Sequence, residues 1–192
     1  MSTKEHTEEK GAFGFWVYLM SDAVLFAGLF AVYAVLQAAT LGGVSVADFA
    51  DLSFVFIETS ILLTSSFVVG LALLAAHRGK KIWTLVALAA VLLLGWCFLG
   101  MELNEFVRLV GEGSGPSHSG SLSAFFALVG THGAHLFFGS LWGLVVLAHV
   151  AVRGLSRATV RKLALFSLFW HFLDIIWIFI FTFVYLIGML AL

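Results

Sequence analysis

Ionisable side chains interrupt several long apolar stretches of this sequence, and their types and spacing could support chemistry. In SLFWHFLDIIWIFIFTFVYL, residues 167–186, His171 and Asp174 are three residues apart among aliphatic and aromatic side chains. Carboxylates and imidazoles in such surroundings can relay protons, bind a metal ion or haem iron, or hydrogen-bond to one another between helices. The candidates outside this stretch are Asp22, Glu58, Glu102, His132 and His135.

Three specific functions compete with plain structural pairing of these groups. Haem ligation would need two histidines facing each other at one depth, and the histidines here have different estimated depths. A metal site could use Glu102 with Glu105 and His132 with His135, because both pairs have the i, i+3 spacing found in di-iron helix bundles. A chain of acids and imidazoles could also conduct protons. We predict that these groups mainly bond to one another and hold the helices together, with no catalytic, cofactor-binding or metal-binding residue.

The elements that carry these side chains are predicted to be membrane-spanning helices. Of the 192 residues, 61% are hydrophobic and 11% are charged, and soluble domains have about 25% charged residues. A helix crosses the hydrocarbon core with about 20 apolar residues. Apolar stretches of that length or longer occupy residues 13–39, 52–76, 82–106, 122–152 and 163–192, after a polar tail at residues 1–12. The sequence therefore predicts an all-α membrane protein, a single domain of five transmembrane helices.

Lys and Arg are distributed unevenly between the two ends of the predicted helices. All except Arg108 lie in the tail, in the turn at residues 78–81 or in the segment 153–162. Short loops rich in Lys and Arg stay in the cytoplasm, so we expect a cytoplasmic N-terminus and a periplasmic C-terminus. No basic patch interleaved with aromatic residues lies outside the apolar stretches, and nucleic-acid binding is therefore not expected.

Counting residues along each predicted helix, at about 1.5 Å of rise per residue, places the ionisable groups in two layers. The inner layer, toward the cytoplasm, holds Asp22, His171 and Asp174, with His135 near it. The outer layer holds Glu58, Glu102 and His132, and Glu105 falls near the outer boundary with water. Gly139 and Gly143 are spaced to let a neighbouring helix approach closely. The expected interhelical partners are Asp22 with His171 or Asp174, and Glu58 or Glu102 with His132.

Four segments of the sequence resemble the third subunit of haem-copper respiratory oxidases. They are FGFWVYLMSDAVLFAGLFAVYAVL at residues 13–36, ETSILLTSS at 58–66, SAFFALVGTHGAHLFFGSLWG at 123–143 and SLFWHFLDIIWIFIFTFVYLIG at 167–188. The order of the THGAH and WHFLD segments in consecutive helices is the most specific feature. The short, five-helix form with a polar tail is most similar to subunit III of bo-type ubiquinol oxidases.

This resemblance implies a non-catalytic accessory subunit of a proton-pumping oxidase in the bacterial cytoplasmic membrane. The haems and copper would lie in subunit I, which is an expected partner together with the other subunits and membrane phospholipids. Related short proteins accompany cytochrome c oxidases and nitric oxide reductases, so either assembly is an alternative. A stand-alone proton or ion transporter that uses the buried acids and histidines is a further alternative.

Overall fold

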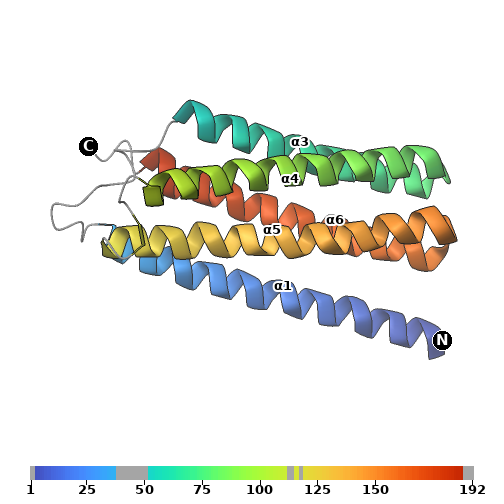
Figure 1. The fold of residues 1–192 in the computed structure, drawn as a ribbon. Coiled ribbons are helices and arrows are strands. Elements are labelled where there is room, and N and C mark those ends of the chain that lie inside the picture. The colour runs from blue at the N-terminus through green and yellow to red at the C-terminus, as the bar shows by residue number, and fades with distance from the viewer. Residues whose placement is uncertain (1–2, 38–51, 112–114, 117–118, 188–192) are drawn as a thin grey trace.

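The computed structural model describes residues 3–37, 52–111, 115–116 and 119–187, with side chains described from residue 10 onward. The described chain forms five long helices that lie side by side in one bundle (Figure 1). They are α1 (Thr3–Leu36), α3 (Leu52–His77), α4 (Lys81–Gly111), α5 (Gly120–Arg153) and α6 (Arg157–Ile180), and α6 continues as the π-helix η1 (Phe181–Leu186). All five are long and apolar enough to cross a membrane. The predicted all-α bundle of five transmembrane helices is confirmed.

The N-terminus and the two tight helix connections lie at one end of the bundle (Figure 1). Gly79 connects α3 to α4 with φ +70°, and Gly154 connects α5 to α6 with φ +68°. Glycine occupies this left-handed region without the steric cost that other residues meet. The turn into α6 is completed by Ser156, whose hydroxyl accepts a hydrogen bond from the Thr159 N–H at 3.2 Å. The basic segments around these two turns therefore share one end of the bundle with the N-terminus.

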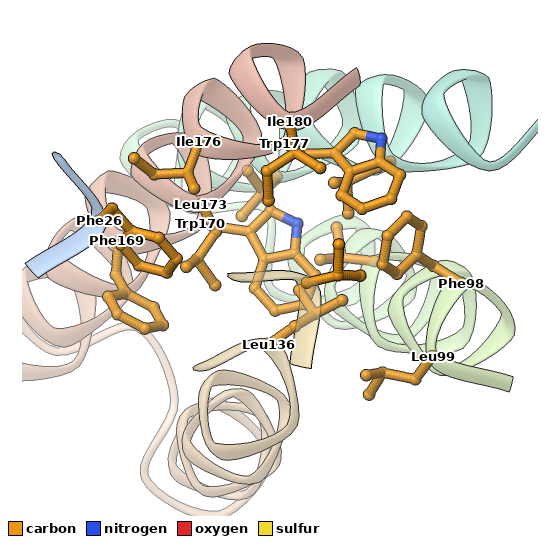
Figure 2. Packing of buried hydrophobic residues seen from close by; sticks show 14 of the residues in the cluster. Phe26, Phe98, Leu99, Leu136, Phe169, Trp170, Leu173, Ile176, Trp177 and Ile180 are labelled. Atoms are coloured by element: carbon orange, nitrogen blue, oxygen red, sulfur yellow. The ribbon is translucent and has the colours of Figure 1, made fainter. Parts of the chain in front are cut away.

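Helix α6 is the most buried of the five and contacts α1, α3 and α5. Its large side chains, including Trp170 and Trp177, pack against Phe98 and Leu136 in the centre of the bundle (Figure 2). The rings of Phe98 and Trp177 meet edge to face, with their centroids 4.6 Å apart, which is a favoured aromatic geometry.

Small residues on α5 make room for side chains of the neighbouring helices. A Cβ atom added at Gly139 would lie 2.7 Å from Cε1 of Phe169, and one added at Gly143 would lie 2.7 Å from Cδ2 of Leu92. Both distances are shorter than carbon atoms tolerate without moving. Because these atoms belong to side chains, the glycines make room for Phe169 and Leu92, and the predicted close approach of a neighbouring helix backbone stays a prediction.

The helix ends differ from the predicted spans where helical structure continues past the apolar residues. Helix α1 begins at Thr3, within the segment predicted as a polar tail, and α6 begins at Arg157, ahead of the predicted start at residue 163. Helix α4 continues to Gly111, whereas its predicted span ended at residue 106. Residues 38–39 and 188–192 of the predicted spans lie outside the described residues.

Candidate functional site

Asp22 of α1 and His135 of α5 form a contact between two helices. The Asp22 Oδ2 atom lies 3.5 Å from His135 Nε2. The other ring nitrogen, Nδ1, lies 2.8 Å from the carbonyl oxygen of Thr131. Because a carbonyl oxygen only accepts hydrogen bonds, Nδ1 carries a hydrogen. A hydrogen bond between Nε2 and the Asp22 carboxyl then needs one more proton, either on Nε2 or on the carboxyl.

Ser66 of α3 hydrogen-bonds to His171 of the WHFLD segment on α6. Its Oγ atom lies 2.6 Å from His171 Nδ1, and either atom can be the donor, depending on the tautomer of the ring. Asp174, in the same segment, is 6% exposed, and its Oδ1 atom has no hydrogen-bond partner among the described residues. The serine therefore joins α3 to α6 through the histidine.

These contacts correct the predicted partners in the inner layer. Asp22 contacts His135 on α5, and not His171 or Asp174 on α6. His171 bonds to the Ser66 hydroxyl on α3. The estimated depths placed His135 near the layer that holds Asp22, as their contact requires. Depth alone does not determine which helices are neighbours.

The outer layer holds a group of carboxyls from α3 and α4. Glu58 is 0% exposed, and Glu102 and Glu105 are each 3% exposed. The three carboxyls are close enough to interact electrostatically. The Tyr185 hydroxyl, from the π-helical segment, donates a hydrogen bond to Glu105 Oε2 at 3.3 Å. The bundle covers the Glu105 side chain, so this carboxyl is not in solvent, and its position near the outer membrane boundary stays a prediction.

The predicted hydrogen bond from Glu58 or Glu102 to His132 is not formed. Within the described part of the chain, neither oxygen of either carboxyl and neither ring nitrogen of His132 has a hydrogen-bond partner. The imidazole is fully buried and lies among aromatic rings, with the centroid of Trp177 5.3 Å away and that of Phe98 6.0 Å away. His132 is therefore packed as a ring inside the core.

Two tryptophan side chains make hydrogen bonds that the sequence reasoning missed. Trp170 Nε1 donates to Ser65 Oγ at 2.9 Å, and Trp177 Nε1 donates to Thr59 Oγ1 at 3.0 Å. Both acceptors, like Ser66, come from the ETSILLTSS segment of α3. Small hydroxyl residues in a membrane helix are a recognised source of interhelical hydrogen bonds, and that signal could have identified this segment as the partner of α6.

The Glu102–Glu105 and His132–His135 pairs do not form a single metal site. Across the described residues, no group of three or more His, Cys, Asp or Glu side chains is arranged to hold a metal ion. His135 is engaged with Asp22, and Glu105 with Tyr185. That this chain binds no cofactor of its own remains a prediction.

The fold and these contacts define a multi-pass helical membrane protein whose polar groups join neighbouring helices. The sequence profile of the family described as cytochrome c oxidase subunit III matches residues 3–189. The chain therefore belongs to this family, which comprises the accessory subunit of haem-copper oxidases.

Relatives of similar length have been named. "Cytochrome bo(3) ubiquinol oxidase subunit 3" of Pseudomonas aeruginosa is 51% identical over 189 residues, which cover 97% of this chain and 90% of the relative. "Quinol oxidase subunit 3" of Bacillus subtilis is 43% identical over 193 residues, covering 98% of this chain and 93% of the relative. The similarity thus extends over nearly the full length of both relatives.

Proposed function

We propose that this chain is the non-catalytic subunit III of a proton-pumping, bo-type quinol oxidase in the bacterial cytoplasmic membrane. The observation that carries the proposal is its near full-length similarity to relatives named as quinol oxidase subunit 3. Subunit I of the complex would hold the haems and copper. The role of this chain would be to pack beside that subunit and stabilise it.

The buried polar groups support a structural role for this bundle. Asp22 with His135 joins α1 to α5, and Ser66 with His171 joins α3 to α6. The hydrophobic effect does not drive helices together in lipid, so interhelical hydrogen bonds and close packing determine how they associate. We propose that these contacts keep the bundle in the one arrangement that its partner subunit recognises.

The proposed orientation has the N-terminus in the cytoplasm and the C-terminus in the periplasm. The turns at Gly79 and Gly154 lie at the same end of the bundle as the N-terminus (Figure 1), and basic residues surround both turns. The positive-inside tendency supports a cytoplasmic location for this end. Phospholipids would cover the apolar helix faces that no partner subunit covers.

The test compares oxidase complexes that carry His171→Ala or Asp174→Ala with the wild-type complex. Removing one partner leaves a buried polar group unsatisfied, so we expect less assembled complex and faster loss of activity during incubation. The initial quinol turnover of the complex that does assemble should stay near the wild-type rate. His77→Ala is the matched control, because His77 is exposed and the one side-chain hydrogen bond it makes among the described residues is within its own helix, to the Leu73 carbonyl oxygen at 2.9 Å.

The same preparations distinguish the competing assignments. Copurification with haem- and copper-bearing chains, together with turnover of ubiquinol and not of cytochrome c, supports the proposal. Ion flux through liposomes that contain this chain alone would favour a transporter. A mutant complex that assembles with full durability and yet loses proton pumping at once would contradict the structural role of His171 and Asp174.

A further inference from the structure

A groove between α4 and α5 leads from the outer surface of the bundle to a buried acid. Its volume is about 360 Å³, within the range of about 300–1,000 Å³ typical of small-molecule sites. Four aromatic side chains line it, namely Trp96, Phe106, Phe137 and Phe138. Trp96 and Phe138 are exposed, so the groove is open to molecules dissolved in the membrane.

Glu102 lines this groove and carries a carboxyl with unused hydrogen-bonding capacity. Neither of its oxygens has a hydrogen-bond partner among the described residues, although the side chain is only 3% exposed. The carboxyl lies against the backbone of Gly133, where an added Cβ would be 2.7 Å from Oε1 and 2.9 Å from Oε2. Gly133 lines the same groove. A buried acceptor of this kind is costly unless it receives a donor, and the groove provides a route for one.

The residues that line the groove restrict the kind of donor. The described lining residues include no Lys, Arg or His, so an anionic phosphate headgroup would find no cation there to pair with. A metal cation would have to give up its hydration against apolar and aromatic walls. A neutral molecule with a hydroxyl donor and an apolar body fits these surroundings.

The shape of the groove favours a flat ring. An added Cβ at Gly100 would meet no atom within 4 Å, and one at Gly130 would meet only Phe106, at 3.7 Å. These glycines leave room for a planar group beside the helix backbone, and the aromatic walls offer stacked or edge-to-face contacts.

We propose that the α4–α5 groove binds a hydroquinone, whose ring lies between the aromatic walls and whose hydroxyl donates a hydrogen bond to Glu102. The apolar tail of the hydroquinone would extend through the open side of the groove into the lipid. This is a binding site only, with no electron transfer on this chain. It goes beyond the proposed function, because an accessory subunit of a quinol oxidase does not itself need to hold quinol.

The first experiment uses the purified oxidase complex and a short-chain ubiquinol that carries an aryl azide. After illumination, mass spectrometry should locate the label on residues 96–106 or 130–138. Glu102→Leu should lower this labelling about tenfold, as expected for the loss of one hydrogen bond to a carboxyl. Glu58→Leu is the matched control, since Glu58 is equally buried and unpartnered and does not line the groove. It should leave labelling at the wild-type level.

A second pair of variants tests the groove without removing a buried acid. Gly100→Leu places a side chain in the groove at a position where an added Cβ meets no atom within 4 Å, and it should abolish the labelling. Gly28→Leu, at an exposed glycine of α1 where an added Cβ also meets no atom within 4 Å, should not change it. Labelling that is unchanged in Gly100→Leu would overturn the inference.

Competition experiments identify the occupant and separate this inference from the proposed function. Excess decylubiquinol should suppress the label, and phosphatidylglycerol should not. Suppression by phosphatidylglycerol alone would make the groove a lipid site and overturn the inference. Quinol turnover by the complex without labelling of the groove would also overturn it, while leaving the proposed function intact. A complex that does not turn over quinol would contradict the proposed function, whatever the labelling shows.

Discussion

The substitution Gly143→Ala tests whether close helix packing stabilises this bundle. The new Cβ would lie 2.7 Å from Cδ2 of Leu92 on α4 and 2.9 Å from Cζ of Phe166 on α6. Side chains of two neighbouring helices must therefore shift to accommodate a single methyl group. Overpacking of this kind costs about 1–3 kcal/mol, which corresponds to about a 5- to 150-fold change in the ratio of folded to unfolded protein.

Gly70→Ala is the control, because an added Cβ at Gly70 of α3 meets no atom within 4 Å. Membrane-spanning segments remain helical when helix packing is lost. The higher helix propensity of alanine therefore stabilises the folded and the unfolded state alike, and it largely cancels from the stability of both variants. The stability of each variant can be measured by SDS titration of the purified chain, followed by tryptophan fluorescence. We expect Gly143→Ala to be less stable than Gly70→Ala by the amount estimated above.

A second substitution makes the packing argument more stringent. Phe166→Leu shortens one of the two side chains that the new methyl group would press against, so the double variant with Gly143→Ala should lose less stability than the sum of the single changes. Equal stability of Gly143→Ala and Gly70→Ala would refute the packing argument. Strict additivity in the double variant would show that Phe166 is not the obstacle.

Three further predictions concern a hydrogen bond, an ion pair and the orientation. Ser65→Ala removes the acceptor of the Trp170 N–H. The loss should lower the free energy of unfolding by about 0.6 kcal/mol, with an upper limit of about 1.7 kcal/mol. The same SDS titration measures it, and an unchanged midpoint would contradict this prediction. Asp22→Leu, which deprives His135 of its partner, should reduce assembled complex on native gels more than Asp22→Asn does, and equal yields would argue against the pair. Lys80→Cys, at an exposed position of the turn beside Gly79, should react with an impermeant maleimide in inside-out vesicles, and reaction only in right-side-out vesicles would reverse the proposed orientation.

The fold class could be predicted from the sequence because the membrane limits what an apolar stretch can form. Backbone N–H and C=O groups have no water to bond to in hydrocarbon, so each such stretch must be helical. Helix ends were less predictable. The apolar run of α4 weakens near Phe106, yet the helix continues to Gly111, since its hydrogen bonds do not depend on side-chain hydropathy. Glu105, near the end of the predicted span, is covered by the bundle and is only 3% exposed.

The sequence by itself predicted which acids and imidazoles interrupt the apolar helices that are long enough to cross a membrane. It also predicted tight packing at Gly139 and Gly143, because glycine has no side chain to keep a neighbouring group away. The tertiary structure alone decided the partners. His135 meets Asp22, and His171 meets Ser66, because partner choice depends on which helices are neighbours and how each is rotated. The spacing of residues along one helix reveals neither its neighbours nor its rotation, since both are set by the packing of all five helices together.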